Sequence, residues 1–313
     1  MKRFTRIAMA LLACGLSMSA SAALEKTVLP FGVKVNGVEN RYPVFGVYAV
    51  PGEMLRLEMV DADSAKIAAR FDTVQLNPID GVLRLKMPDQ PGTHTLELTT
   101  ADGQASMHLN VFVMWRLDTV TQDALNGYRI GTYPRQPMNG LAIYEAPQAF
   151  IEVTRENADL QVSPNFRLKQ FVCKQGNDYP KYVLLRPELL QKLEMVLAAV
   201  NAAKPTVTGF TVMSGYRTPS YNRSIGNVEH SMHEWGGAAD VFVDTGGDGQ
   251  MDDLNADGHV DRNDAAWLAD LVDNMERTGR FANQLIGGIG IYAATPSHGP
   301  FTHIDARGFK ARW

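Results

Sequence analysis

The segment from Ser231 to Asp240 places the strongest constraint on the fold, because it sets a histidine and an aspartate seven residues apart around a pair of glycines. Gly236 and Gly237 allow a tight backbone turn after His233. Residues 238–243 then alternate as a strand does, with Asp240 on one face. Residues 301–305 alternate in the same way and carry His303. We therefore expect a loop and two distant strands to bring these side chains to one point.

Two imidazoles and one carboxylate are a ligand set that suits Zn²⁺. Three protein ligands leave the fourth position open for water, which is typical of a catalytic zinc site and not of a structural one. Each residue alone is more often a surface histidine or a turn carboxylate. Together with the glycines they predict zinc bound by His233, Asp240 and His303.

The full motif also carries a resemblance. It reads Ser-x-His-x-x-Gly-x-Ala-x-Asp, follows Ser214-Gly215-Tyr216-Arg217-Thr218 and precedes His303-x-Asp305. This pattern resembles the zinc D-Ala-D-Ala carboxypeptidase and murein endopeptidase family, whose fold is shared with lysostaphin-type peptidases and the hedgehog domain. The resemblance covers the C-terminal half of the chain. It implies the three zinc ligands above, and it implies that Arg217 holds substrate and stabilises developing negative charge.

The general base departs from the family pattern. In relatives it stands two or three residues before the last zinc histidine, where this chain has Phe301 and Pro300, which cannot accept a proton. Asp305, on the same strand face as His303, is the first candidate, and His298 and His230 follow. The alternative for Asp305 is to orient a ligand histidine.

A length of 313 residues favours two domains. Short alternating runs separated by turns predict an all-β, immunoglobulin-like sandwich over residues 23–115. Residues 116–165 are interpreted as a β-rich linker, with a wall of the substrate groove as the alternative. Residues 166–313 form the predicted zinc peptidase domain, an antiparallel sheet flanked by helices, so the chain is α+β overall. Its clearest helix spans 186–201, with Pro187 in the first turn and one apolar stripe.

The N-terminus indicates export. Residues 1–22 combine a basic start, a short apolar run and a small-x-small ending, which is typical of a cleaved secretory signal. Leu11-Leu12-Ala13-Cys14 also resembles a lipoprotein site, so a lipid anchor at Cys14 is the alternative. Cleavage after Ala22 leaves Cys173 alone, which excludes an internal disulfide. No other long apolar stretch follows, so we expect no transmembrane helix in the mature protein. We expect the protein to be periplasmic or secreted, or to be an outer-membrane lipoprotein if Cys14 is lipidated.

A second metal motif lies in an insert at residues 244–264. Residues 253–264 match the twelve-residue calcium loop, with oxygen donors at the expected positions and Gly258 at the bend. The predicted structural Ca²⁺ ligands are Asp253, Asn255, Asp257, His259 through its carbonyl, Asp261 and Asp264. An acidic solvated turn is the alternative.

These features predict a secreted zinc peptidase whose partner is the peptide part of peptidoglycan. The net charge of −4 gives no reason to expect a nucleic acid or an anionic membrane as partner. A D,D-carboxypeptidase and a murein endopeptidase both remain open. The competing hypothesis is a non-catalytic peptidoglycan-binding or scaffold protein that keeps the peptidase fold.

Overall fold

The computed structural model describes residues 28–61 and 67–313. The described part is mostly β-structure in several sheets, with three α-helices. The predicted signal segment and Cys14 lie outside the described residues. Within those residues, no helix has the length and apolar character needed to cross a membrane.

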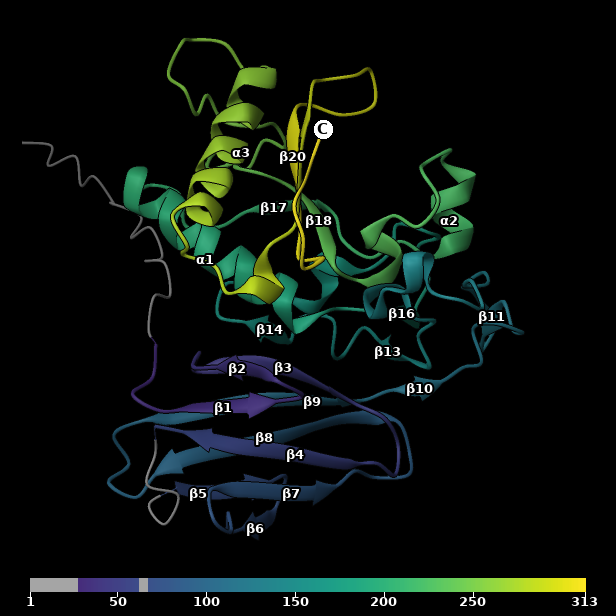
Figure 1. The fold of residues 1–313 in the computed structure, drawn as a ribbon, viewed down its shortest axis with the longest axis vertical. Helices are drawn as coiled ribbons and strands as arrows, with labels where there is room; N and C mark the ends of the chain where they lie inside the picture. Colours follow the sequence, from purple (N-terminus) through teal and green to yellow (C-terminus); the bar gives the residue numbers. More distant parts are fainter. Residues whose placement is uncertain (1–27, 62–66) are drawn as a thin grey trace, which may run out of the picture.

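Two sheets form the N-terminal part, at the bottom of Figure 1. The strand order of one sheet is β2-β1-β4-β7 and that of the other is β3-β9-β8-β5-β6. The bounds are β1 Gly32–Val35, β2 Val38–Asn40, β3 Val44–Ala49, β4 Met54–Val60, β5 Ile67–Phe71, β6 Val74–Leu76, β7 Val82–Lys86, β8 Gly92–Thr100 and β9 Ser106–Val113. Most neighbours are antiparallel, but β3 and β9 pair in parallel, with Val44 opposite His108. The immunoglobulin-like classification itself stays a prediction.

The sandwich forms because its strands alternate between apolar and polar side chains. Val33, Leu57, Leu96 and Leu109 are completely buried. Successive side chains of a strand point to opposite faces, so one apolar face of each strand reaches the core.

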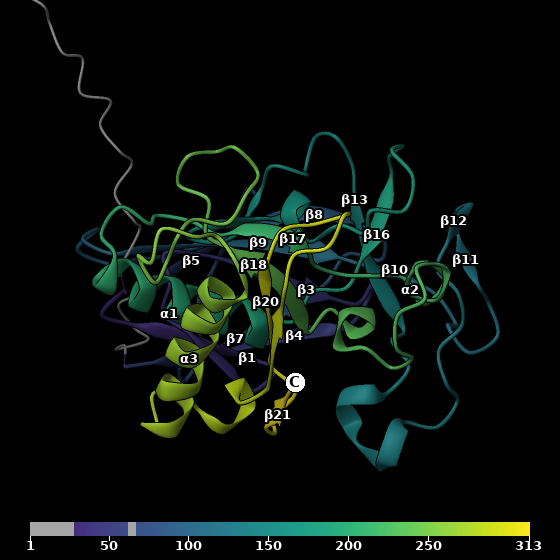
Figure 2. The ribbon, with the colours of Figure 1, turned by 90° about the horizontal axis from the view of Figure 1, so that it is seen from above.

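The C-terminal part is built on a five-stranded sheet with the order β17-β18-β20-β19-β21. Its strands are β17 Thr211–Ser214, β18 Ala238–Phe242, β19 Gly288–Tyr292, β20 Phe301–Asp305 and β21 Ala311–Arg312. The neighbours are antiparallel except β19 and β21, which are parallel. The helices are α1 Pro187–Ala203, α2 Pro219–Ser224 and α3 Arg262–Arg277. In Figure 2, α1 and α3 lie on the same side of β18 and β20.

Helix α1 agrees with the prediction, since Pro187 occupies its first turn and its apolar stripe is buried. Asp261 is the N-cap of helix α3. Its side chain accepts a hydrogen bond from the Asn263 amide, and the Asp264 side chain accepts one from the Asp261 amide. Such reciprocal caps satisfy amides that the first helical turn leaves unpaired.

The segment between the two parts is more than a spacer. Its strands are β10 Trp115–Arg116, β11 Ala124–Leu125, β12 Tyr128–Arg129, β13 Ala149–Val153, β14 Gln161–Ser163, β15 Phe166–Arg167 and, after it, β16 Lys181–Val183. β13 lies between β10 and β16 in a three-stranded sheet, which joins this segment to the C-terminal part. Short 3₁₀ helices follow at Met138–Gly140 (η2), Ala142–Tyr144 (η3), Leu168–Phe171 (η4), Met232–Trp235 (η5) and Asn283–Leu285 (η6).

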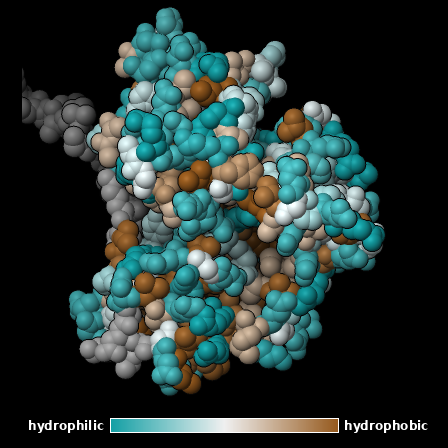
Figure 3. Space-filling model, in the orientation of Figure 1, coloured by the Kyte–Doolittle hydropathy of each residue, from teal (hydrophilic) through white to brown (hydrophobic). Residues whose placement is uncertain are grey.

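The sandwich is attached to the C-terminal part by direct hydrogen bonds. Asn110 Nδ2 donates to the Gln161 carbonyl at 2.8 Å, and Gln191 of α1 donates to the Glu39 carbonyl. The face of the molecule seen in Figure 3 is largely hydrophilic, with separate apolar patches. Cys173 is a buried free thiol.

Candidate metal centre

One row of residues runs across the C-terminal sheet and carries two of the predicted zinc ligands. Ser214 of β17 lies opposite Asp240 of β18, Asp240 lies opposite His303 of β20, and His303 lies opposite Gly290 of β19. Directly opposed residues project from the same face of a sheet. The register therefore brings Asp240 and His303 together, although 62 residues separate them in the chain.

His233 reaches the same point from η5. Gly236 ends this turn in the left-handed region, at a φ of 65°, and a Cβ there would collide with the backbone of Leu184. Glycine is the residue that tolerates both demands. The Arg217 amide donates to the His233 carbonyl at 3.1 Å, which fixes the turn over the sheet.

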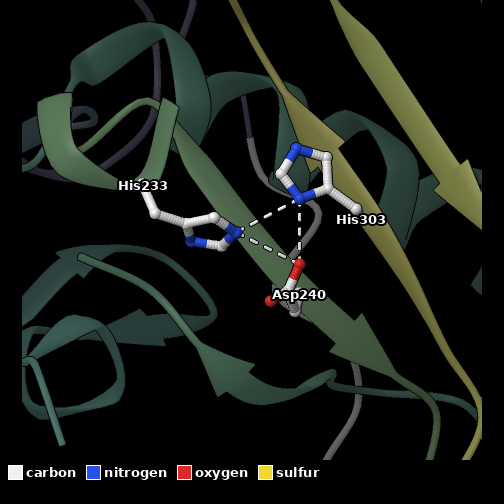
Figure 4. Close-up of side chains that lie close together, drawn as sticks. All are labelled: His233, Asp240 and His303. Atoms are coloured by element: carbon white, nitrogen blue, oxygen red, sulfur yellow. Dashed lines mark hydrogen bonds and ion pairs between the residues drawn. The ribbon is translucent and has the colours of Figure 1, made fainter. Parts of the chain in front are cut away.

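The three side chains point toward one another (Figure 4). His233 Nε2 lies 3.1 Å from His303 Nδ1 and 3.2 Å from Asp240 Oδ1, and His303 Nδ1 lies 2.9 Å from the same oxygen. Bonds of about 2.0–2.1 Å in a tetrahedral zinc site separate neighbouring ligands by roughly 3.4 Å. The three donors therefore span a triangle close to the size that Zn²⁺ requires. Among the described residues this is the group of His, Cys, Asp or Glu side chains that meets the geometry of a metal site.

In each imidazole, the ring nitrogen that points away from the candidate site has a hydrogen-bond acceptor. This acceptor determines whether the other ring nitrogen presents a lone pair to the site. His233 Nδ1 lies 2.6 Å from the Gly215 carbonyl, and His303 Nε2 lies 3.1 Å from Asp305 Oδ2. A carbonyl oxygen can only accept, so His233 Nδ1 carries the proton, and in the neutral ring Nε2 presents a lone pair. The Asp305 carboxylate favours the corresponding tautomer of His303. Two lone pairs and a carboxylate oxygen then face one buried point, an arrangement that a cation stabilises.

The pKa shifts of His233 and Asp240 agree with this assignment of protons, whereas the shift of His303 favours its protonated ring. Burial lowers the pKa of His233, which favours the neutral ring. Burial opposes ionisation of Asp240, but the neighbouring imidazoles hold its pKa well below the ordinary value. For His303, burial is outweighed by the Asp240 and Asp305 carboxylates, which raise its pKa. Asp240 is thus ionised.

Arg217 makes its described side-chain contacts with protein groups beside the candidate site. Its Nη2 donates to Asp240 Oδ2, and its Nε donates to Ser214 Oγ at 2.8 Å. The side chain is buried but borders the cleft. The described contacts therefore make Arg217 a residue that fixes the second oxygen of Asp240, so that Oδ1 faces the two histidines.

Asp305 lies behind His303 and away from the metal-facing atoms. It is completely buried, and its oxygens accept from Arg307 Nε at 2.9 and 3.0 Å and from the Gly288 amide at 2.7 Å. Burial alone would raise its pKa, but His303 and Arg307 lower it strongly. A carboxylate with this environment has little tendency to take a proton. The contacts match the orienting alternative and not the first-choice role of general base.

Asp305→Asn separates these two roles. If Asp305 orients His303, the variant is expected to bind zinc about 10–100-fold more weakly while keeping most of its turnover at saturating zinc. Loss of a general base would instead lower turnover by about 10²–10⁴-fold with zinc affinity unchanged. Competition with a chromogenic chelator measures the affinity. Asp273→Asn, at a more exposed carboxylate paired with Arg312, is the control.

The segment predicted as a linker supports the metal-binding turn. Tyr133 Oη donates to the Glu234 carbonyl at 2.6 Å, and Trp235 Nε1 donates to the Glu145 carbonyl at 2.9 Å. The Tyr133 and Tyr144 rings both pack edge-on against Trp235, with centroids 5.3 Å away. The groove-wall alternative therefore has structural support, because Tyr144 and Met138 border the cleft.

The metal-binding atoms line an open cleft of about 450 Å³. Its lining includes residues 227–232, Met138, Tyr144, Tyr292, Phe301, Arg307 and Trp313. His298 is not among the residues that line it; its Nδ1 contacts the Gly299 carbonyl at 2.8 Å. His230 does line it, in a left-handed backbone conformation with φ of 61°.

Two residues that border the cleft were not predicted from the sequence motifs. Glu229 precedes His230 in the same loop, and Trp313 follows His303 by ten residues. The sequence could have pointed to Glu229, because this carboxylate is adjacent to the candidate base His230. No sequence pattern points to Trp313, because strand pairing brings it to the site. Burial raises the pKa of Glu234 to about 7, but its carboxylate accepts from Asn222 and lies outside the cleft lining.

The calcium prediction gains no support from the structure. Both Asp264 oxygens accept backbone amides, from Leu254 at 2.7 Å and Asp261 at 2.8 Å, and Asp253 accepts from the Gly258 amide at 2.9 Å. Within the described residues, no three of this loop's carboxylates offer oxygens close enough together for one ion. The carboxylates instead satisfy amides of the loop and of the first turn of α3.

A buried His-Asp-His cluster at the floor of a cleft, held by two neighbouring antiparallel strands and the η5 turn, has the donor set of a catalytic zinc site. The family model described as peptidase M15 matches residues 160–256, which include His233 and Asp240 and end before His303. This match covers less than half of the chain and supports a metallopeptidase of the D-Ala-D-Ala carboxypeptidase type. No curated protein matches the chain.

Solved structures resemble the chain over about a quarter of its length. Fibronectin(III)-like modules of Clostridium thermocellum CbhA are 15% identical, with 26% of this chain and 94% of that chain covered and a TM-score of 0.18. Titin M4 is 20% identical, with 27% of this chain and 98% of that chain covered and a TM-score of 0.18. Scores this low carry no argument, so the description of the sandwich rests on its own strand pairing.

Proposed function

We propose that this protein is an exported zinc peptidase that hydrolyses peptide bonds in the stems or cross-links of peptidoglycan. The observation that carries the proposal is the convergence of His233 Nε2, His303 Nδ1 and Asp240 Oδ1 in a buried site that opens into a cleft. The peptidase M15 match supports the reaction class and the type of substrate. Export rests on the signal-like segment 1–22, and the lipid anchor at Cys14 remains its alternative.

Each residue of the centre has a separate task in this proposal. Zn²⁺, when bound, supplies polarisation of the peptide carbonyl and acidification of water. His233, His303 and Asp240 hold the ion, while Arg217 and Asp305 fix Asp240 and His303 from behind. The proton from water passes to a group on the cleft wall. Apart from the three metal-binding residues, the carboxylate and imidazole groups that line the cleft are Glu229 and His230.

Substitution of the two cleft acceptors identifies the base. We expect Glu229→Gln or His230→Gln to lower turnover by about 10²–10⁴-fold, with zinc content unchanged, because a general base contributes roughly that factor. The variant that removes the base also loses the acidic limb of the pH–rate profile. His298→Gln, outside the cleft, serves as control. Full turnover in both cleft variants would show that the base lies elsewhere.

The function is tested by digesting purified sacculi with the mature protein, loaded with zinc or treated with a chelator. Release of new muropeptides by the zinc-loaded sample alone is the expected result. Loss of single D-Ala residues identifies a carboxypeptidase, whereas conversion of cross-linked dimers to monomers identifies an endopeptidase. Unchanged sacculi, with protein bound to them, would favour the non-catalytic binding protein instead.

A further inference from the structure

The cleft has an aromatic wall beside the metal site, formed by Tyr292, Phe301 and Trp313. The Tyr292 and Phe301 rings stack with centroids 4.5 Å apart and planes 8° from parallel. Trp313 Nε1 donates to Tyr292 Oη at 2.6 Å, and the Trp313 ring lies 5.0 Å from the His303 ring. The wall therefore begins directly next to a metal-binding imidazole.

Several neighbouring groups fix the position of the Trp313 indole. A Cβ on Gly290 would collide with Trp313 Nε1, and a Cβ on Gly288 would lie 2.8 Å from Cη2. The backbone beside the ring is tied to β19, since Ile291 donates to the Trp313 carbonyl at 3.0 Å. The Arg307 guanidinium lies over the ring at 5.5 Å. The absence of side chains at two β19 positions thus makes room for this one ring.

The indole nevertheless stays accessible. Trp313 is 47% exposed and Tyr292 is 36% exposed, whereas Phe301 beneath them is buried. A large aromatic that is fixed on several sides and still open to a cleft offers binding area at little cost in side-chain entropy. Arg307, whose guanidinium lies over the Trp313 ring, uses Nε and Nη2 to bind Asp305, so its charge is partly neutralised within the protein.

We propose that Trp313, supported by Tyr292, binds the side chain of the substrate residue next to the scissile bond, and that this side chain is small and aliphatic. The proposal rests on the proposed function, which places the scissile carbonyl at the His233–Asp240–His303 site. Adjacent Cα atoms of a peptide are about 3.8 Å apart, so the residue beside that bond is the substrate group within reach of a ring that touches His303. Met138, Val228 and Met232 add further apolar side chains to the cleft lining.

A double-mutant cycle that combines Trp313 variants with altered substrates tests the proposed contact between Trp313 and the substrate side chain. Wild type, Trp313→Ala and Trp313→Phe are assayed on two glycan-free cross-linked stem peptides that differ by alanine or glycine beside the scissile bond. We expect Trp313→Ala to lower kcat/KM on the alanine peptide by about tenfold or more, and Trp313→Phe to restore most of it. The wild-type preference for alanine over glycine, about fourfold for one buried methyl group, should disappear in Trp313→Ala. Trp267→Ala is the matched control, because Trp267 is a half-buried indole on α3 under Lys204, outside the cleft lining.

The outcomes separate the contact from the function. Zinc content must remain at the wild-type level in Trp313→Ala; its loss would make Trp313 a support for His303 and overturn the substrate role. A defect seen only with glycosylated substrates would overturn it in favour of sugar binding. If the wild-type protein cleaves nothing, the proposed function fails. The contact is then tested by calorimetric titration of the alanine peptide into zinc-loaded protein. Roughly tenfold weaker binding by Trp313→Ala supports binding of the side chain by Trp313, and equal binding rejects it.

Discussion

His233→Ala is expected to weaken zinc binding by a few hundredfold and to abolish peptide hydrolysis. Structural zinc sites with four ligands bind with about 10–16 kcal/mol, so loss of one of three protein ligands should cost roughly 3–4 kcal/mol, a weakening of a few hundredfold. Elemental analysis should fall from about one zinc per chain to near zero after dialysis. Hydrolysis should fall to the level of the chelator-treated wild type, because the groups that remain cannot polarise the carbonyl.

His298→Ala is the matched control for this prediction. His298 also belongs to the C-terminal part, but it lies outside the cleft lining and its ring packs against Phe301. It should retain one zinc and wild-type hydrolysis. A His233→Ala protein that keeps one tightly bound zinc would contradict the ligand assignment, provided that its thermal unfolding shows an intact fold.

Lys192→Met is expected to lower the free energy of unfolding by about 3 kcal/mol or more. Lys192 is completely buried, and its Nζ donates to Glu276 Oε1 at 3.0 Å and to the Asp305 carbonyl at 2.8 Å. Burial lowers its pKa, which Glu276 partly opposes. Removal of one partner of a buried pair leaves an incompletely compensated charge, which costs about 3–5 kcal/mol. Arg312 still binds Glu276, so we expect the lower end of that range.

Urea unfolding in the presence of chelator measures this effect without a contribution from bound zinc. Lys310→Met is the control, since Lys310 pairs with Asp273 at 3.5 Å on the exposed surface. Exposed ion pairs contribute about 0–1 kcal/mol, so the control should change little. A loss below about 1 kcal/mol for Lys192→Met would show that water or neighbouring groups replace its hydrogen bonds. The same variant should weaken zinc binding, because Lys192 holds the strand end that carries Asp305.

Several elements follow from local sequence alone. The apolar stripe and Pro187 predicted the helix at 186–201, and it is present as Pro187–Ala203. The alternation at 238–243 and 301–305 predicted strands, and both are present at those positions. These features depend on interactions between residues close in the chain, so a single sequence contains the information.

The linker interpretation shows where local reasoning ends. Gly, Tyr and Pro in residues 116–165 indicated turns, but Tyr133 and Tyr144 pack against Trp235 about a hundred residues later. Strand β13 is also paired on both edges, with β10 and β16. Contacts between such distant residues leave no periodic signal in the segment itself.

The sequence by itself determined the donor set of the candidate centre and the turn and strands that carry it, because residue chemistry, glycine and alternation act locally. Only the tertiary structure decided what Arg217, Asp305 and Trp313 contact. Arg217 and Asp305 stand within the recognised motif, yet both bind to residues of the candidate centre, Arg217 to Asp240 and Asp305 to His303. Which acceptor a long side chain reaches depends on strand register and on neighbours from other parts of the chain, and Gly290 opposite His303 leaves the space that Trp313 occupies.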